Sequence, residues 1–293
     1  MNKKILKSII PEFVKDFLRK RKERRARRGG AHHIKDLRDL VIEQQAAELR
    51  AQHINPLNRH GKKCFSQTDE DGITIEILRR LGKLEAGTFA EFGVADGTEN
   101  NTLILRALGW RGFWVGGSDL AFNVTLAKPV FSYFKEWVTA DNICAIAKRG
   151  LDAISAKELD VVSLDLDGND IYFVQRLLDS GVCPILFIVE YNAKFLPPIK
   201  WRIDYSDNHM WAEDDYFGAS LSSFVELFEK HGYMLICCNT HTGSNAFFIK
   251  KIFAHLFEDV PKDIHVLHSV PRYYLPTTYG HKPSLKTLAN LFR

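Results

Sequence analysis

The sequence predicts an α/β fold: a doubly wound sheet of five parallel strands that ends in an antiparallel hairpin. Between about residues 64 and 250, short β-rich runs alternate with longer runs of helical period. The β-rich runs are almost wholly apolar, which is typical of parallel strands that helices cover on both faces. Only the last two runs are joined by a loop of hairpin length, THTGS.

The expected elements follow one another in a regular order. The strands cover residues 88–92, 113–116, 137–140, 160–166 and 185–191. The helices cover residues 71–82, 99–109, 142–149, 170–180 and 219–231. The hairpin strands are YMLICCN and NAFFIKK. In such a sheet ligands bind beyond the carboxyl ends of the strands, so functional residues are expected there.

The composition is that of a globular protein, with 45% hydrophobic and 26% charged residues among 293. We divide the chain into a basic amphipathic tail (1–30), a helical extension (31–61), the α/β domain (62–252) and a C-terminal extension (253–293). The sequence contains neither a run of about 18 apolar residues nor a secretory signal, which predicts a cytoplasmic protein without a membrane span. The five scattered cysteines form no Cys-x-x-Cys pair and indicate reduced thiols.

Charge is distributed unevenly along the chain. Residues 1–28 contain twelve Lys or Arg and three acids, a net charge of +9, whereas the rest of the chain carries a net charge of −5. An apolar stripe of helical period precedes the basic run RKRKERRARR. This combination predicts peripheral contact with an anionic membrane, each basic group adding about 1 kcal/mol. A solvated arm, or packing on a partner protein, are the alternatives. Nucleic acid is not expected, because the acidic body cannot extend the contact.

A second amphipathic helix is expected at residues 36–52, with Leu37, Leu40, Val41 and Leu49 near one face. This face predicts packing either on the body of the protein or on a second copy of the chain, which would form a homo-oligomer.

The loop after the first strand reads EFGVADGTENNT and contains a G-x-x-x-G spacing, Gly93 to Gly97, instead of the G-x-G-x-x-G of dinucleotide sites. The acids Glu91 and Asp96 flank these glycines and would repel a pyrophosphate. They suit a cationic ligand with an amine and ribose hydroxyls, such as S-adenosylmethionine. The alternative is a simple tight turn between a strand and a helix.

Further acidic residues follow the fourth and fifth strands: Asp165 and Asp167 in one case, Glu190 and Asn192 in the other. Side-chain alternation places Asp165 and Asp167 on the same side of their strand. Asp167, Glu190 and Asn192 therefore predict a site for a hard cation such as Mg²⁺. In the alternative interpretation, Asp165 binds the amine of the cofactor and Asp167 caps the next helix.

Such a cation would lower the pKa of an acceptor hydroxyl, while a carboxylate or a histidine takes the proton. Asp165, Asp167 and His241 are the predicted catalytic residues, and His209 is a second candidate base. His209 lies in the long loop 193–217, whose tryptophans and tyrosines could stack on a sugar.

As a set, seven stretches of the sequence resemble the FkbM-type family of class I methyltransferases. They are FSQTDEDGI (65–73), FAEFGVADGTENNT (89–102), GWRGFWVGGS (109–118), VTADNI (138–143), VSLDLDGNDIY (162–172), FIVEYN (187–192) and SNAFFIK (244–250). The resemblance covers about residues 62–252. It implies a Rossmann-like methyltransferase sheet, S-adenosylmethionine as cofactor, and methyl transfer to sugar hydroxyls.

The resemblance also implies which residues bind the cofactor. Glu91, Gly93, Asp96 and Gly97 would line its methionine part, and Asp141 and Asn142 would approach its adenine. The remaining members of the expected cofactor site are Gln67, Asn101, Gly117, Ser118 and Asp165. Family members usually carry an acid at the end of the second strand for the ribose hydroxyls, but this sequence has Gly116 there, and Asp119 follows three residues later.

The sequence therefore predicts an S-adenosylmethionine-dependent O-methyltransferase that modifies a sugar of a bacterial surface glycan or glycolipid, with Mg²⁺ assistance, at the inner face of the cytoplasmic membrane. Two alternatives remain open. One is a metal-dependent glycosyltransferase that uses the Asp-x-Asp motif, and the other is a catalytically degenerate scaffold tethered to a membrane.

Overall fold

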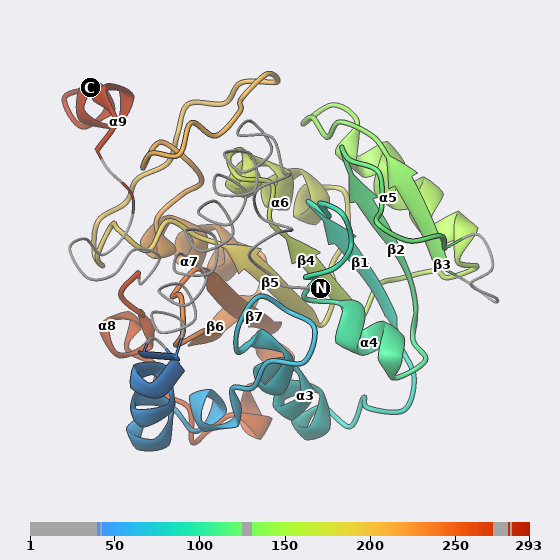
Figure 1. Ribbon diagram of the computed structural model, residues 1–293, viewed down its shortest axis with the longest axis horizontal. Coiled ribbons are helices and arrows are strands. Elements are labelled where there is room, and N and C mark those ends of the chain that lie inside the picture. Colours follow the sequence, from blue (N-terminus) through green and yellow to red (C-terminus); the bar gives the residue numbers. More distant parts are fainter. Residues whose placement is uncertain (1–39, 42, 125–130, 272–280, 282) are drawn as a thin grey trace, which may run out of the picture. The chain divides into compact units, whose positions relative to one another are not determined.

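The computed structural model describes residues 40–41, 43–124, 131–271, 281 and 283–293 (Figure 1). The chain divides into two units, residues 1–48 and residues 49–293. In the first unit, residues 40–41 and 43–48 are helical. The predicted membrane contact of residues 1–28 lies outside the described residues, as does the start of the helix expected at 36–52. The domain boundaries at residues 30, 61 and 252 stay predictions.

The second unit is built on one seven-stranded sheet with the order β3-β2-β1-β4-β5-β7-β6 (Figure 1). Strands β1 to β5 are parallel, and β7 is antiparallel to both β5 and β6. The strands are β1 (Thr88–Phe92), β2 (Arg111–Gly116), β3 (Phe131–Lys135), β4 (Val161–Leu164), β5 (Leu186–Glu190), β6 (Tyr233–Cys238) and β7 (Asn245–Lys250). The predicted fold class, five parallel strands followed by an antiparallel hairpin, is confirmed.

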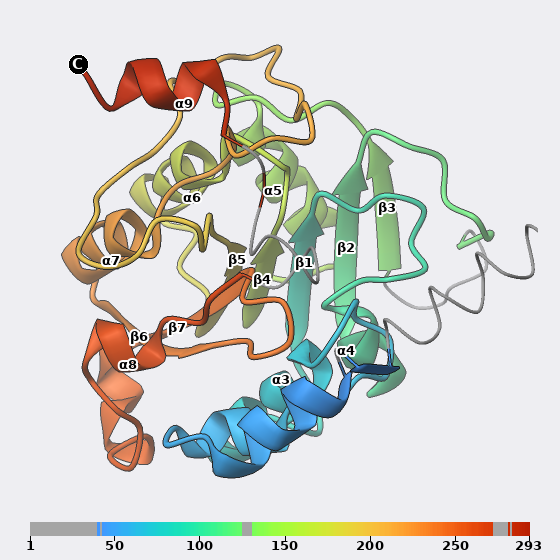
Figure 2. The same ribbon diagram turned by 60° about the vertical axis from the view of Figure 1, so that its left-hand side comes forward.

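Helices cover the sheet on both faces, with α3 and α4 on one side and α5 and α6 packed together on the other (Figures 1 and 2). The helical elements are η1 (Pro56–His60), α3 (Glu70–Arg80), α4 (Leu103–Ala107), α5 (Ile143–Ala153), α6 (Asp170–Asp179), α7 (Leu221–Lys230), η2 (Lys251–Leu256), α8 (Ile264–Leu267) and α9 (Leu285–Asn290). Every side chain of β1 and β4 is buried, as the apolar strand sequences require. Among the described residues, each helix is too short or too polar to cross a membrane.

The third strand is not where the sequence analysis placed it. The predicted strand 137–140 is wrong, because β3 runs from Phe131 to Lys135 and pairs with β2 along its whole length. Residues 136–139 are irregular and residues 140–142 form a turn, and the side chain of Asn142 accepts a hydrogen bond from the Thr139 N–H (2.8 Å) and donates one to the Trp137 carbonyl (2.8 Å). A side chain that binds its own neighbouring backbone in this way competes with the strand ladder.

The strand order reverses between β1 and β4, which are adjacent and parallel. The chain leaves β1 at Phe92, β4 at Leu164 and β5 at Glu190, so three consecutive sheet positions end at the same edge. The carboxyl edge at such a switch point is the usual place for a ligand in an open α/β sheet.

Candidate active site

The loop after β1 lies directly against the end of β4. Gly93 has a φ of 101°, and a Cβ atom built on it would lie 1.4 Å from the Asp165 carbonyl oxygen. Its N–H donates to the Val115 carbonyl at the end of β2 (3.0 Å). Only glycine fits a position with this φ and this close backbone contact, so Gly93 allows the loops after β1 and β4 to meet.

Glu91 organises the rest of the loop. Its carboxylate accepts hydrogen bonds from the Asn101 N–H (2.9 Å), the Thr102 N–H (3.0 Å) and the Thr102 hydroxyl (2.5 Å). Burial raises the pKa of Glu91, and the bonds from Thr102 and Asn101 oppose the rise. The helix expected at 99–109 is shorter in the structure and begins at Leu103, directly after these two N–H groups.

A cavity of about 290 Å³ opens between this loop and the end of β4. Its lining contains seven of the residues predicted to bind the cofactor: Gln67, Glu91, Gly93, Asp96, Gly97, Asn101 and Asp165. The other lining residues are Ala95, Thr98, Glu99, Asn100 and Asn245. Within the described part of the chain no basic side chain lines the cavity, so its acidic and amide groups favour a cationic ligand over a phosphate.

Four of the predicted cofactor residues do not line this cavity: Gly117, Ser118, Asp141 and Asn142. The Asn142 amide is engaged in the turn after β3. The Ser118 carbonyl accepts a hydrogen bond from the Tyr133 hydroxyl. The residues expected near the ribose and adenine thus follow β2 and β3, outside the cavity that holds the methionine-side residues.

Gly116 cannot be replaced by the acid that the family resemblance leads one to expect. A Cβ atom at Gly116 would lie 1.9 Å from the Val94 carbonyl oxygen, because the loop after β1 crosses the end of β2 at this point. Asp119 is 87% exposed and forms an ion pair with Lys135 (2.8 Å). The acid is therefore missing for a steric reason.

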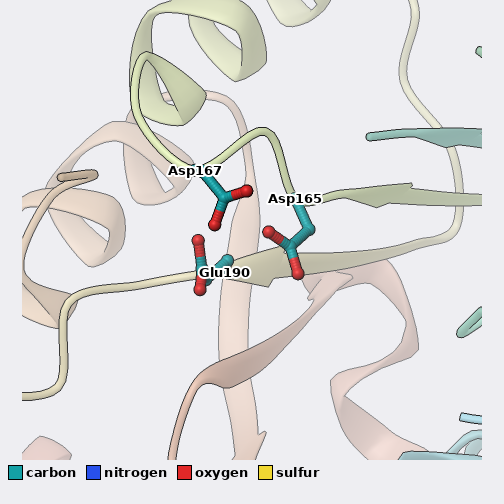
Figure 3. Close-up of side chains that lie close together, drawn as sticks. All are labelled: Asp165, Asp167 and Glu190. Carbon is teal, nitrogen blue, oxygen red and sulfur yellow. The ribbon is translucent and has the colours of Figure 1, made fainter. Parts of the chain in front are cut away.

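The acids after β4 and β5 converge on one point, which Figure 3 shows. Asp165, Asp167 and Glu190 each present a carboxylate oxygen, and these atoms lie within 4.8 Å of one another. The expected alternation along a strand does not bring them together, since β4 ends at Leu164 and Asp167 adopts a left-handed φ of 54° in the following turn. The turn aims Asp167 back at Glu190 (Figure 3).

The cluster is electrostatically strained when no cation is bound. Burial, followed by the charge of a neighbouring carboxylate, raises the pKa of both Asp165 and Glu190 well above the usual range. Burial also raises the pKa of Asp167. Among the described residues, Glu190 Oε2 is buried without a hydrogen-bond partner. Such a group of acids favours either bound protons or a bound cation.

Asp170, and not Asp167, holds the start of α6. Its buried carboxylate accepts hydrogen bonds from the Leu166 N–H (2.7 Å) and the Gly168 N–H (2.8 Å). Burial raises the pKa of Asp170 to about 6, against the effect of these bonds. These bonds close the turn before α6, whose N-cap, Asn169, has no side-chain cap hydrogen bond. The alternative in which Asp167 caps this helix is therefore wrong, and the Asp167 carboxylate faces the cluster (Figure 3).

Asn192 and His241 occupy other positions. The Asn192 amide donates to the carbonyls of Asp215 and Phe217 (2.9 and 3.0 Å), and its oxygen accepts the Lys194 N–H (3.3 Å), so this side chain braces the long loop after β5. The His241 N–H donates to Asp69 (3.3 Å), and His241 does not line the cavity.

The other histidine candidate, His209, lies beside the acidic turn. Its ring fills the space next to Gly168, where an added Cβ atom would come within 2.2 Å of the His209 Cδ2 atom. Burial lowers the pKa of His209. Its Nε2 atom is buried and has no hydrogen-bond partner among the residues that the structure describes.

His209 also lines a second cavity, of about 500 Å³, between the long loop and α9. Its lining contains Asp204, Tyr205, Ser206, Asn208, His209, Met210, Tyr216, Lys286, Ala289 and Arg293. Asp215 anchors α9 by accepting hydrogen bonds from the Ser284 N–H and the Thr287 hydroxyl, both at 2.7 Å. This contribution could not be predicted from the sequence, because residues 253–293 lie outside the family resemblance.

No protein-family model matches the chain, and no curated protein matches it. Among solved structures, the chain is similar to a candidate hemolysin from Lactococcus lactis (8% identity, TM-score 0.37, covering 64% of this chain and 90% of that one). It is similar to a candidate S-adenosylmethionine-dependent methyltransferase from Listeria monocytogenes (11% identity, TM-score 0.34, 60% and 96%). A third is MycE methyltransferase of the mycinamycin pathway, in complex with Mg, SAH and mycinamycin VI (12%, TM-score 0.31, 70% and 50%). At these scores the similarity carries no weight for function, which must be inferred from the site.

Proposed function

We propose that the protein is an S-adenosylmethionine-dependent O-methyltransferase that acts on a sugar hydroxyl with the help of a divalent cation. One observation carries this proposal: Asp165 belongs both to the wall of the acidic cavity and to the three-carboxylate cluster. A cationic cofactor in the cavity and a hydroxyl beside the cluster would therefore be neighbours, which is the arrangement that methyl transfer requires.

The cavity suits S-adenosylmethionine because this cofactor carries positive charge on its sulfonium and its α-ammonium group. A nucleotide sugar, the donor of a glycosyltransferase, would place its pyrophosphate against Glu91, Asp96 and Glu99. The same carboxylates that attract the first ligand repel the second, so the lining favours the methyltransferase.

The three carboxylates fit a hard divalent cation, because oxygen ligands are the ones that Mg²⁺ prefers, and the unpartnered Glu190 Oε2 atom supplies one. Asp165, Asp167 and Glu190 would hold the ion. A cation in this position lowers the pKa of an oxygen that it binds.

His209 is the proposed base. Its lowered pKa keeps the imidazole neutral at pH 7, so the ring, which lines the second cavity, can accept the proton of the acceptor hydroxyl. S-adenosylmethionine, when bound, would supply the methyl group for the hydroxyl oxygen and would leave as a neutral thioether. Asp167, on the adjoining turn, would stabilise the imidazolium that forms.

The cavity between the long loop and α9 is the proposed acceptor site. The rings of Tyr205 and Tyr216 and the Lys286 ammonium suit a sugar, since aromatic faces pack on its C–H groups. We further propose that the acceptor is a bacterial surface glycan or glycolipid. Residues 1–28 would contact the membrane and place the protein at its inner face, and residues 36–52 would form a homo-oligomer.

Calorimetry on the full chain tests the cofactor. We expect S-adenosylhomocysteine to bind in the presence of Mg²⁺, and nucleotide sugars not to bind. Binding of a nucleotide sugar alone would identify a glycosyltransferase instead. If none of these ligands binds, with or without Mg²⁺, the chain is a scaffold with a methyltransferase-like sheet.

A further inference from the structure

Asn245, the first residue of β7, is a polar residue of the cavity wall; it lies in the stretch SNAFFIK, but the sequence assigned it no role. It is 6% exposed, and it lines the cavity together with Asp165. Its Nδ2 atom donates to Glu70 Oε1 (3.1 Å), whereas within the described residues its Oδ1 atom is buried without a hydrogen-bond partner. An unsatisfied buried acceptor is destabilising, so a native structure usually supplies a donor, and a ligand can be that donor.

The sheet places this oxygen at the edge of the acidic cluster. Asn245 is directly opposite Glu190 in the antiparallel pairing of β5 with β7. The backbone C=O of Asn245 accepts a hydrogen bond from the Asn239 N–H (2.9 Å), and the Asn245 N–H donates to the Asn239 side chain (2.9 Å), so neither group bonds to β5. The bond to β5 comes one residue earlier, where the Ser244 carbonyl accepts the Tyr191 N–H (2.8 Å). Asn245 and Glu190 thus form a non-hydrogen-bonded pair, in which Cα atoms are about 4.5 Å apart and side chains lie closest.

Glu70, at the start of α3, determines which way the Asn245 amide points. Its carboxylate accepts hydrogen bonds from the Asn245 amide, the Asn239 amide (3.0 Å), the Thr68 hydroxyl (2.9 Å) and the Thr68 N–H (3.0 Å). Rotating the amide by half a turn would bring Oδ1 against the Glu70 carboxylate, where two acceptors would repel each other. Nδ2 must therefore face Glu70, and Oδ1 must face away from it.

Most other carboxylate oxygens of the cavity are already in use. Both oxygens of Glu91 accept hydrogen bonds from the loop, and Asp96 Oδ1 accepts the N–H and the hydroxyl of Thr98 (3.0 and 2.6 Å). Glu99 forms an ion pair with Lys63 (3.3 Å). Among the described residues, Asn245 Oδ1 is the side-chain oxygen of this lining that is buried without a hydrogen-bond partner, and Asp165 belongs to the same lining. A ligand group with several donors, such as an ammonium, matches two acceptors on one wall.

We propose that Asn245 Oδ1 accepts a hydrogen bond from the α-ammonium group of the cofactor's methionyl part, and that Glu70 is the positioning residue that fixes this amide. The proposal rests on the proposed function, since it names a contact to the same cofactor. This hydrogen bond would make the cavity specific for a ligand with a free amine. Through Glu70, it would also link recognition of that amine to the start of α3.

Two ligands separate this contact from general effects: S-adenosylhomocysteine, which has the ammonium, and 5′-methylthioadenosine, which lacks the amino-acid part. Both are titrated by calorimetry into the full chain with Mg²⁺ present. For Asn245→Ala we expect S-adenosylhomocysteine to bind about 10- to 100-fold more weakly, the loss typical of a hydrogen bond to a charged group, and 5′-methylthioadenosine to bind unchanged.

Glu70→Gln is the second variant, because it keeps the shape but lets the new amide donate to Asn245 Oδ1. Like Asn245→Ala, it should weaken the binding of S-adenosylhomocysteine relative to that of 5′-methylthioadenosine, so the ratio of the two affinities should fall. Asn58→Ala is the matched control: Asn58 is a buried asparagine that donates to the Cys238 carbonyl (2.7 Å) behind the same hairpin and does not line the cavity. This variant should leave the ratio unchanged.

Equal weakening of both ligands in Asn245→Ala would show that Asn245 only supports the fold, and unchanged binding of both would show that the contact does not exist. Loss of Mg²⁺ binding with an unchanged ratio of the two ligand affinities would make Asn245 a cation ligand, which also overturns the proposal. If the unmodified protein binds neither ligand, the proposed function fails, an outcome distinct from the other three.

Discussion

Replacing Glu190 by Gln should stabilise the protein in the absence of a divalent cation. Two full negative charges within 4.8 Å repel each other by about 3.5 kcal/mol at an effective dielectric constant of about 20. Bound protons relieve part of this repulsion, because the pKa values of Asp165 and Glu190 are raised. We expect Glu190→Gln to increase the free energy of unfolding by about 1–3 kcal/mol at pH 8 in a chelator. The Gln amide can still donate a hydrogen bond to Asp165.

The pH dependence gives the sign of this effect. A carboxyl whose folded pKa is raised binds its proton more tightly in the folded state, so stability is greatest below the unfolded pKa and falls as pH rises toward the folded value. The difference between the variant and the unmodified protein should therefore vanish near pH 4 and be largest at pH 8. Urea denaturation followed by circular dichroism at these two pH values measures it.

Mg²⁺ should reverse the ranking. A cation that binds the folded cluster stabilises the unmodified protein by mass action, and Glu190→Gln removes one of its three carboxylate ligands. Glu76→Gln is the matched control: Arg79 and Arg80 hold the pKa of Glu76 at about 2, so its loss should destabilise the protein at pH 8 whether or not Mg²⁺ is present. Destabilisation by Glu190→Gln at pH 8 in a chelator would refute the repulsion argument.

Three further predictions concern individual residues. Asp167→Ala should abolish methyl transfer but leave S-adenosylhomocysteine binding nearly intact, because Asp167 does not line the cavity; loss of cofactor binding in calorimetry would contradict its assignment to the cluster. Gly116→Ala should destabilise the protein by at least about 2 kcal/mol in denaturation experiments, since the new Cβ would lie 1.9 Å from the Val94 carbonyl, whereas Gly117→Ala, with open space around it, should have little effect. Equal stability of the two variants would show that lack of space does not explain the missing acid at position 116. His209→Gln should lower the transfer rate and remove its fall at acid pH, which for the unmodified enzyme should begin below the usual pKa of a histidine. An unchanged pH profile would assign the base to another residue.

The predicted parts of the fold were those that depend on local pattern. Apolar β-rich runs and helical runs of the right length are visible in the sequence, and they led to six of the seven strands and to the antiparallel end of the sheet. The exception was β3, FSYFK, because the neighbouring WVTA looks equally strand-like until the Asn142 side chain closes a turn over it.

The candidate site was also predictable in part, again from the local sequence pattern. Acids that follow parallel strands must gather at one edge of a sheet, so Asp165, Asp167 and Glu190 could be expected close together before their distances were known. The choice of their neighbours could not be predicted. His209 and His241 both lie in loops, and only the packing of the long loop against Gly168 brings His209 to the acidic turn.

The amino-acid sequence alone determined the order of the elements, the strand ends where the acids gather and the acidic character of the loop after β1, because these are properties of spacing and residue type. Tertiary structure alone decided that Gly116 has no room for an acid, that a left-handed turn aims Asp167 at Glu190, and that Asn245, whose Oδ1 atom is buried without a partner among the described residues, lines the cavity. The physical reason is distance along the chain. Glu70 and Asn245 are 175 positions apart, and no local pattern encodes a hydrogen bond that exists only after the sheet has brought both residues to the same edge.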